Sequence, residues 1–300
     1  MDTFSPLPDT ELLNPLFQDL EQKPLASLID MLLVQHAHAV QAVQNASPAI
    51  ELAVRACAAH LSKGGRLLYA GAGTSGRLGV MDGAELIPTF GWPTERVGFL
   101  MAGGMPALIE AQEGAEDDKE AALKDIDTIG LSPNDVLILL SASGNTPYVL
   151  ALAHEAFVKG VLTIGVTNNE QSLLLSQSTH AIYLKTGSEA LQGSTRLKAG
   201  TAQKIFLSTF STALMAQLGY VYKGFMINLR PTNDKLRKRQ RNIIMQLTGL
   251  PRESAENLLK ESKGDLKVAV LMNKKGLSCD AAGVLLAQSG GDLHYALSLK

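Results

Sequence analysis

Apolar runs alternating with helical patterns constrain the fold of this chain more than any other feature. Residues 135–140 and 161–166 are nearly continuous apolar runs, and a helix is predicted between them over 147–159. Strands that are apolar at successive positions are buried on both faces, which is typical of a parallel sheet covered by helices. A helix over 47–61 followed by an apolar run repeats the order. The sequence therefore predicts an α/β fold with a parallel sheet.

The first apolar run ends in a turn rich in glycine and hydroxyl groups, Gly71-Ala-Gly73-Thr74-Ser75-Gly76. A helical pattern follows, so backbone N–H groups at the helix start are free to bind an anion. Thr74 and Ser75 add hydroxyl donors, and glycine allows a ligand to approach the backbone closely. Phosphate is the expected anion, with Gly73, Thr74 and Ser75 at the site.

The same turn matches G-x-G-x-x-G, so a dinucleotide-binding fold is an alternative. That fold needs an acidic residue at the end of the next strand. The next apolar run, 97–101, is followed by Ala102-Gly103-Gly104 and offers none. A nucleophile elbow is not matched either, because Ser75 and Ser143 lack the glycines two residues away on both sides.

A second hydroxyl-rich loop, Ser141-Ala-Ser143-Gly-Asn145-Thr146, follows the run at 135–140 and leads into a helix at Pro147. Loops at the carboxyl ends of parallel strands face one crevice, where open α/β sheets bind ligands. The loop is predicted to hold phosphate; the alternative is that its hydroxyls only cap the helix.

Composition limits the class of protein. With 46% hydrophobic residues, 300 residues can bury one large α/β core with a helical appendage. The formal net charge of −2 does not indicate a nucleic-acid or membrane-surface protein. Cys57 and Cys279 are far apart, which favours reduced thiols. The first residues do not resemble a signal peptide, and no window reaches the ~18 apolar residues of a membrane span, so a cytoplasmic location is expected.

Carboxylates near the predicted phosphate site are candidates for acid and base roles. Glu85 follows Gly76 by nine residues and is expected close to the turn. Glu116 lies in a stretch, 105–123, that shows a helical pattern with many acids. Gly114 within that pattern is costly in a helix, which indicates close backbone packing near Glu116.

The remaining segments complete the predicted organisation. A polar loop over 187–198, containing Glu189, Ser194, Arg196 and Lys198, precedes a long apolar helix and could complete a sugar-phosphate site. The basic run at 230–241 lacks interleaved aromatic residues, which favours a solvated helix face over a nucleic-acid site. Short helical patterns at 251–262, 266–273 and 278–288 predict a small three-helix bundle for packing or dimer support. An arm followed by a helix through Val43 is expected at the N-terminus.

Several of these motifs, in this order, resemble the N-acetylmuramic acid 6-phosphate etherases over about residues 48–300. The matching motifs are Gly71–Gly79, Asp82-x-x-Glu85, Glu113–Asp117, Ser141–Tyr148, Gly193–Lys204 and Thr232-Asn233-x-Lys235-Leu236. The resemblance implies a flavodoxin-like parallel sheet of the sugar isomerase (SIS) type, in a homodimer with its site near the subunit interface. It implies neither a cofactor nor a metal. The expected division is an N-terminal arm and helix over 1–47, an SIS domain over 48–230 and a helical subdomain over 231–300.

The family cleaves the lactyl ether of N-acetylmuramic acid 6-phosphate, giving N-acetylglucosamine 6-phosphate and D-lactate in cell-wall recycling. By resemblance Glu85 donates a proton to the departing lactate and Glu116 takes the C2 proton. The two must differ in protonation. Burial, which favours the protonated form, is expected at Glu85, and a cationic or hydrogen-bonding neighbour such as Arg196 or Lys198, which favours the ionised form, is expected at Glu116. The expected substrate-binding residues are Gly73, Thr74, Ser75, Ser141, Ser143, Asn145, Thr146, Glu189, Ser194, Arg196 and Lys198.

The chain departs from the family pattern at two places. Ala84 stands where the family usually has Ser, and Gln35-His36-Ala37-His38 replaces an Asn-x-Glu-Asp element, although Thr10-Glu11-x-x-Asn14 is kept. These changes leave substrate preference and the partner's contribution open. Two alternatives use the same fold: a sugar-phosphate sensor resembling the glucokinase regulatory protein, and an aldose–ketose phosphate isomerase. The two retained glutamates, and a length that fits one SIS copy, favour the etherase over the sensor; lactate release would exclude the isomerase.

Overall fold

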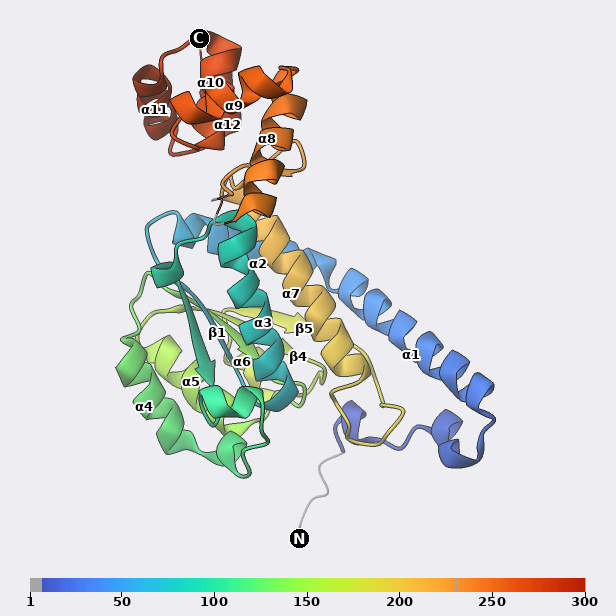
Figure 1. Ribbon diagram of the computed structural model, residues 1–300. Coiled ribbons are helices and arrows are strands. Elements are labelled where there is room, and N and C mark those ends of the chain that lie inside the picture. Colours follow the sequence, from blue (N-terminus) through green and yellow to red (C-terminus); the bar gives the residue numbers. More distant parts are fainter. Residues whose placement is uncertain (1–6, 230, 232, 300) are drawn as a thin grey trace. The chain divides into compact units, whose positions relative to one another are not determined.

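The computed structural model describes residues 7–229, 231 and 233–299 (Figure 1). Arg230 of the basic run and Thr232 of the last family motif lie outside these residues. The chain packs as two compact units. The first extends to Ala84 and resumes over Glu95–Ser211; the second comprises Glu85–Thr94 and the chain from Thr212 onward. The expected domain boundaries stay a prediction.

The first unit is built on a five-stranded sheet with the order β2-β1-β3-β4-β5. All neighbouring strands are parallel, which confirms the predicted fold class. Every residue of β1 and β3 is buried, as their continuous apolar sequences predict. The strands are β1 (Leu67–Gly71), β2 (Val97–Met101), β3 (Val136–Leu140), β4 (Leu162–Thr167) and β5 (His180–Tyr183).

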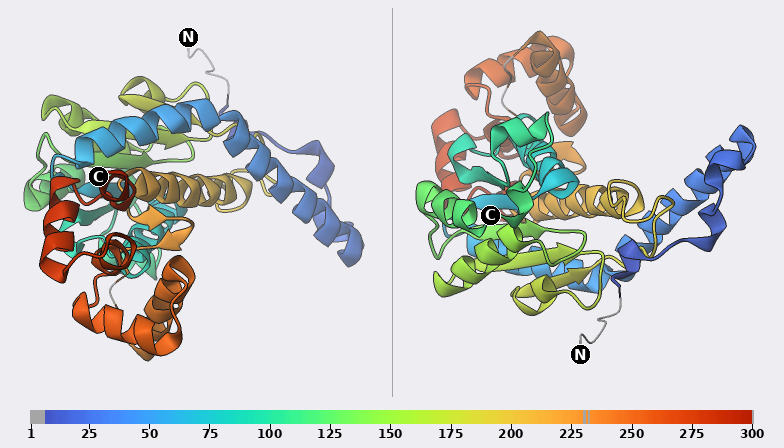
Figure 2. Two further views of the ribbon diagram at one scale, coloured as in Figure 1. Left: turned by 90° about the horizontal axis from the view of Figure 1, so that it is seen from above. Right: turned by 90° about the horizontal axis from the view of Figure 1, so that it is seen from below.

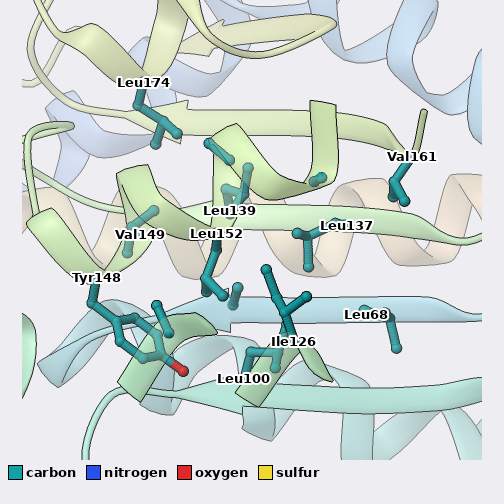
Figure 3. Packing of buried hydrophobic residues seen from close by; sticks show 14 of the residues in the cluster. Leu68, Leu100, Ile126, Leu137, Leu139, Tyr148, Val149, Leu152, Val161 and Leu174 are labelled. Atoms are coloured by element: carbon teal, nitrogen blue, oxygen red, sulfur yellow. The ribbon is translucent and has the colours of Figure 1, made fainter. Parts of the chain in front are cut away.

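Helices cover both faces of this sheet (Figure 1). On one face α4 (Lys119–Ile129) and α5 (Pro147–Val158) pack on the strands, and Leu68, Leu137 and Leu152 belong to the buried cluster between them (Figure 3). On the other face lie α2 (Ser47–Leu61), α3 (Gly73–Phe90) and α7 (Lys198–Gln217). A short helix, α6 (Leu173–Ser176), joins β4 to β5.

The N-terminal region is an arm followed by a long helix, as expected. The arm contains three 3₁₀ turns, η1 (Asp9–Glu11), η2 (Pro15–Phe17) and η3 (Leu20–Gln22). The helix α1 (Leu25–Asn45) pairs with α2 at its C-terminal end, and its N-terminal half extends beyond the sheet (Figure 2).

The single helix predicted over 105–123 is wrong. The segment contains two 3₁₀ turns, η5 (Met105–Leu108) and η6 (Ala115–Asp117), and α4 starts only at Lys119. Gly114 has φ +71°, a left-handed conformation that interrupts a right-handed helix. The side chain of Asp118 then accepts the backbone N–H of Ala121 and starts α4.

The second unit is mainly helical. The predicted short helices are confirmed as α9 (Arg252–Glu261), α10 (Leu266–Lys275) and α11 (Cys279–Gln288), and α8 (Asp234–Thr248) and α12 (Leu293–Ser298) pack with them. A two-stranded hairpin of β6 (Val221–Tyr222) and β7 (Phe225–Met226) precedes α8. Within this unit the Trp92 ring packs on Tyr220, whose ring lies 5.4 Å from the ammonium of Lys267.

Among the residues described, no helix combines the length and the apolar character needed to span a bilayer.

Candidate functional site

The strand order places a candidate site at the carboxyl ends of β1 and β3. Connections leave the sheet in opposite directions at these two neighbouring strands, which is where doubly wound sheets bind ligands. The two glycine- and hydroxyl-rich loops follow these strands. The two loops that the sequence singled out therefore follow neighbouring strands at the same edge of the sheet.

Glycine is required in the first loop because the backbone turns back on itself. A Cβ on Gly71 would lie 2.7 Å from the backbone nitrogen of Gly76, and a Cβ on Gly76 would lie 2.3 Å from the sulfur of Met101. Real side-chain carbons do not approach so closely, so both positions need glycine. The turn starts α3 at Gly73, which is exposed, while Thr74 is half-buried and Ser75 is buried.

The second loop brings its three predicted hydroxyls together. The oxygen of Ser141 lies 2.8 Å from that of Thr146 and 3.3 Å from that of Ser143, and it accepts the backbone N–H of Gly144. Thr146 is the N-cap residue of α5, yet its side chain makes no capping bond. The hydroxyls thus form a cluster with each other, and the alternative that they only cap the helix does not describe Thr146.

Asn145 points elsewhere. Its side chain is exposed, and its Oδ1 accepts the backbone N–H of Leu173 at the start of α6. The structure therefore does not place this predicted binding residue with the hydroxyl cluster.

The third loop reaches the first through the start of α7. A Cβ on Gly200 would lie 3.3 Å from the methyl carbon of Thr74, so the first turns of α7 and α3 touch. Ser194 and Arg196 lie in the segment just before α7; Ser194 is half-buried and Arg196 is exposed. Three predicted loops therefore converge within the first unit.

Two predicted binding residues of this third loop are buried and already have partners. Both carboxylate oxygens of Glu189, which is 1% exposed, accept backbone N–H groups of Lys198 and Ala199, at 3.0 and 2.7 Å. A carboxylate there complements the helix dipole and fixes the start of α7. The ammonium of Lys198 donates to Gln35 Oε1 at 2.8 Å and to the Ser188 carbonyl at 2.9 Å. Burial lowers the pKa of Lys198, and the charge of Glu189 opposes that shift.

The N-terminal arm supports the same loop, which sequence reasoning missed. Thr10 donates its backbone N–H to Asn169 Oδ1 and accepts the Asn169 amide at its hydroxyl. The carbonyl of Thr10 also accepts the backbone N–H of Gly193, and the Asn14 amide donates to the Ser188 carbonyl at 3.4 Å. The retained pattern Thr10-Glu11-x-x-Asn14 was the available signal for these contacts.

Glu116 lies on η6, which packs against α5, the helix that follows the hydroxyl cluster. Its side chain is exposed. Arg77, in the first turns of α3, donates to the carbonyl of Ala107 at 2.9 Å and so ties the connection after β2 to α3. The suggestion that Lys198 neighbours Glu116 is not supported, because the Lys198 ammonium is bound to Gln35 and Ser188.

Glu85 lies on the helix that the first loop starts, and its expected place near that loop stays a prediction. Helix α3 continues unbroken from Gly73 to Phe90, so nine residues at 1.5 Å per residue place Glu85 about 14 Å along the axis from Gly76. Its side chain is exposed in the single chain, so the chain alone does not supply the expected burial.

Asp82 lies one helical turn before Glu85 and is buried. The sequence pattern had indicated no role for it. Its carboxylate accepts the Tyr69 hydroxyl at 3.1 Å and the Ser211 hydroxyl at 3.2 Å. Burial raises the pKa of Asp82, and hydrogen bonds from Tyr69 and Ser211 partly oppose this shift. Asp82 thus links α3 to both β1 and α7.

Known proteins support this reading of the fold. Residues 118–213 match the family model of the SIS domain, and residues 49–156 match that of the glucokinase regulatory protein N-terminal SIS domain. A structure from Bacteroides fragilis, provisionally described as a phosphosugar isomerase involved in capsule formation, is similar with a TM-score of 0.52. It is 24% identical and aligns with 67% of this chain and 95% of its own, which supports the SIS fold alone.

Two relatives that span most of the chain are both named N-acetylmuramic acid 6-phosphate etherase. The N-acetylmuramic acid 6-phosphate etherase of Deinococcus radiodurans is 45% identical over 88% of this chain and 87% of its own length. The etherase of Salmonella choleraesuis is 42% identical over 88% of this chain and 89% of its own. By this similarity the chain belongs to the N-acetylmuramic acid 6-phosphate etherases, a family of carbon–oxygen lyases.

Proposed function

We propose that this chain cleaves the D-lactyl ether of N-acetylmuramic acid 6-phosphate to N-acetylglucosamine 6-phosphate and D-lactate, in cytoplasmic recycling of cell-wall amino sugars. The observation that carries the proposal is the cluster of Ser141, Ser143 and Thr146 hydroxyls at the carboxyl end of β3, next to the glycine turn that starts α3. Hydroxyls and free helix N–H groups suit a sugar phosphate.

The proposed reaction is an elimination followed by hydration. In the open-chain aldehyde the C2 proton is acidic, and Glu116 removes it as general base. The electron pair forms the C2–C3 double bond as the C3–O bond to lactate breaks, and Glu85 donates a proton to the departing oxygen. Water then adds, with its hydroxyl going to C3 and a proton returning to C2. No external oxidant or reductant is needed.

We further propose that the active form is a homodimer with the site near the subunit interface. Exposed apolar side chains recur along α1 at helical spacing: Leu25 is 71% exposed, Ile29 48% and Leu33 62%. Leu13 and Leu16 of the arm are exposed as well. A continuous apolar stripe of this kind is typical of an interaction surface, and a partner would provide cover that the single chain does not. Sedimentation analysis at micromolar concentration should give a dimer mass, and Ile29→Lys with Leu33→Lys should give a monomer.

Activity is tested by incubating the wild-type chain with N-acetylmuramic acid 6-phosphate in D₂O. The expected result is D-lactate release with deuterium at C2 of the product. Glu85→Gln and Glu116→Gln should each lose at least about 10²-fold in kcat, since each removes an acid–base group. Glu113→Gln serves as the matched control, because Glu113 is also exposed and lies three residues before Glu116.

Three results separate the alternatives. Binding of sugar phosphate with no lactate release by the wild type would refute the etherase and favour a sensor. Aldose–ketose interconversion without lactate release would instead favour an isomerase. Full activity of Glu116→Gln would overturn the role given to that residue.

A further inference from the structure

A buried cation with neutral partners lies at the start of α7. Lys198 is 4% exposed, and its ammonium donates to two uncharged oxygens, the Gln35 amide and the Ser188 carbonyl. Removing a charge from water is costly, and buried cations are usually paired with a carboxylate. The arrangement is therefore unfavourable for stability taken alone.

The nearby carboxylate does not form an ion pair with this ammonium. Both oxygens of Glu189 accept backbone N–H groups at the start of α7. Among the residues described, the ion pairs include neither Glu189 nor Lys198. The charge of Lys198 is thus only partly compensated by Glu189, at a distance beyond a direct contact.

Gln35 contacts this ammonium from another part of the chain. It lies on α1, 163 residues away in sequence, and is 7% exposed. Two and three residues further along α1, Ala37 and His38 are exposed. The residue after Gln35, His36, contacts α7, the helix that starts at Lys198. The Nδ1 atom of His36 lies 3.1 Å from the Thr201 hydroxyl.

Lys198 starts the helix that contacts the predicted phosphate site, so its positive charge can act on a bound ligand. The start of α7 touches Thr74 through Gly200, at the turn predicted to bind phosphate. Buried beneath the surface, the ammonium acts on a ligand through its field rather than by contact, and fields are poorly screened where water is excluded.

We propose that Gln35 is a positioning residue that holds the Lys198 ammonium without neutralising it, so that its charge strengthens binding of a sugar phosphate dianion at the converging loops. This inference rests on the proposed function and adds a residue that sets substrate affinity. Gln35 does not touch the substrate and takes no part in proton transfer.

The decisive variant is Gln35→Glu. Glutamate has nearly the same shape and keeps an oxygen acceptor for Lys198, so the hydrogen bond persists while one negative charge is added. KM for N-acetylmuramic acid 6-phosphate should rise about tenfold or more, because at an effective dielectric constant of about 20 a unit charge contributes at least that factor to a dianion about 10 Å away. We expect kcat within about twofold of wild type and an unchanged or higher Tm, since the buried cation gains a counter-charge.

Two further variants separate charge from structure. Gln44→Glu adds the same charge at an exposed position nine residues further along α1 and should leave KM unchanged. Gln35→Met removes the acceptor without adding charge; it should lower Tm while changing KM less than threefold. Unchanged KM in Gln35→Glu, or an equal rise in Gln35→Met or Gln44→Glu, would overturn the proposal.

A binding measurement keeps this test independent of catalysis. Calorimetric titration with N-acetylglucosamine 6-phosphate should show the same loss of affinity in Gln35→Glu, and inorganic phosphate should compete less well than with wild type. If the wild type released no lactate, the etherase proposal would fail, while these titrations would still decide the role of Gln35. Equal affinities of wild type and Gln35→Glu would refute that role even in an active enzyme.

Discussion

Replacing Gly144 by alanine tests whether the hydroxyl loop, Ser141–Thr146, has room for a side chain at this position. Gly144 has φ +69°, and a Cβ there would lie 2.3 Å from the Cβ of Ser172 and 2.6 Å from the hydroxyl of Thr167. Both neighbours are buried and cannot move into solvent. The left-handed conformation costs an alanine about 1 kcal/mol, and the overlap adds about 2 kcal/mol more. We therefore expect a loss of about 3 kcal/mol in the free energy of unfolding.

The chain provides a matched control at the end of α5. Gly160 has φ +70° but nothing within 4 Å of a built Cβ, so Gly160→Ala carries the backbone cost alone, about 1 kcal/mol. At about 3 °C per kcal/mol, Tm of the first unit should fall by about 9 °C in Gly144→Ala and about 3 °C in Gly160→Ala. Far-UV circular dichroism is the suitable probe, since the single tryptophan, Trp92, belongs to the second unit. Equal losses in both variants would refute the steric argument.

Two further predictions concern buried charges. Asp135 accepts four hydrogen bonds, three from Arg66 and one from the Ser132 backbone. Burial raises the pKa of Asp135, but the bonds from Arg66 and Ser132 outweigh burial, so the pKa of Asp135 is lowered. The stabilisation by the Asp135 carboxylate is present above the unfolded pKa of about 3.9 and is lost as pH falls through the folded pKa. In urea titrations Asp135→Asn should therefore cost about 3 kcal/mol of unfolding free energy at pH 7 and much less near pH 3. A pH-independent difference would contradict this. Burial lowers the pKa of Lys267, whose ammonium donates to the Gly291 carbonyl, so a folded Lys267 binds its proton less tightly than an unfolded one. Calorimetry should therefore show wild type gaining stability relative to Lys267→Met as pH rises toward about 10, and the opposite slope would refute the assignment.

The sequence predicts the central architecture well because its signals are local. The apolar runs at 135–140 and 161–166 became β3 and β4 within one residue at each end. The helix predicted over 105–123 failed because Gly114 adopts a left-handed conformation that apolar spacing does not reveal. Periodicity reports which face of a segment is apolar, whereas a chain reversal depends on single backbone dihedrals.

The candidate site was predictable in its loops but not in its long-range contacts. Ser141, Ser143 and Thr146 are neighbours in sequence, so their clustering followed from a strand end. Lys198 and Thr10 have partners more than 150 residues away, at Gln35 and Asn169. The pattern Thr10-Glu11-x-x-Asn14 marks the arm, but no local pattern identifies the residues that it binds.

The hydrogen bonds between Thr10 and both Asn169 and Gly193 also bear on how the protein folds. Thr10 precedes both partners in the chain by 159 residues or more. Closing so long a loop must await the sheet that carries Asn169, because contacts of high sequence separation are entropically costly to form early. The loop before α7 therefore acquires its final shape late, once the arm has docked on the finished sheet.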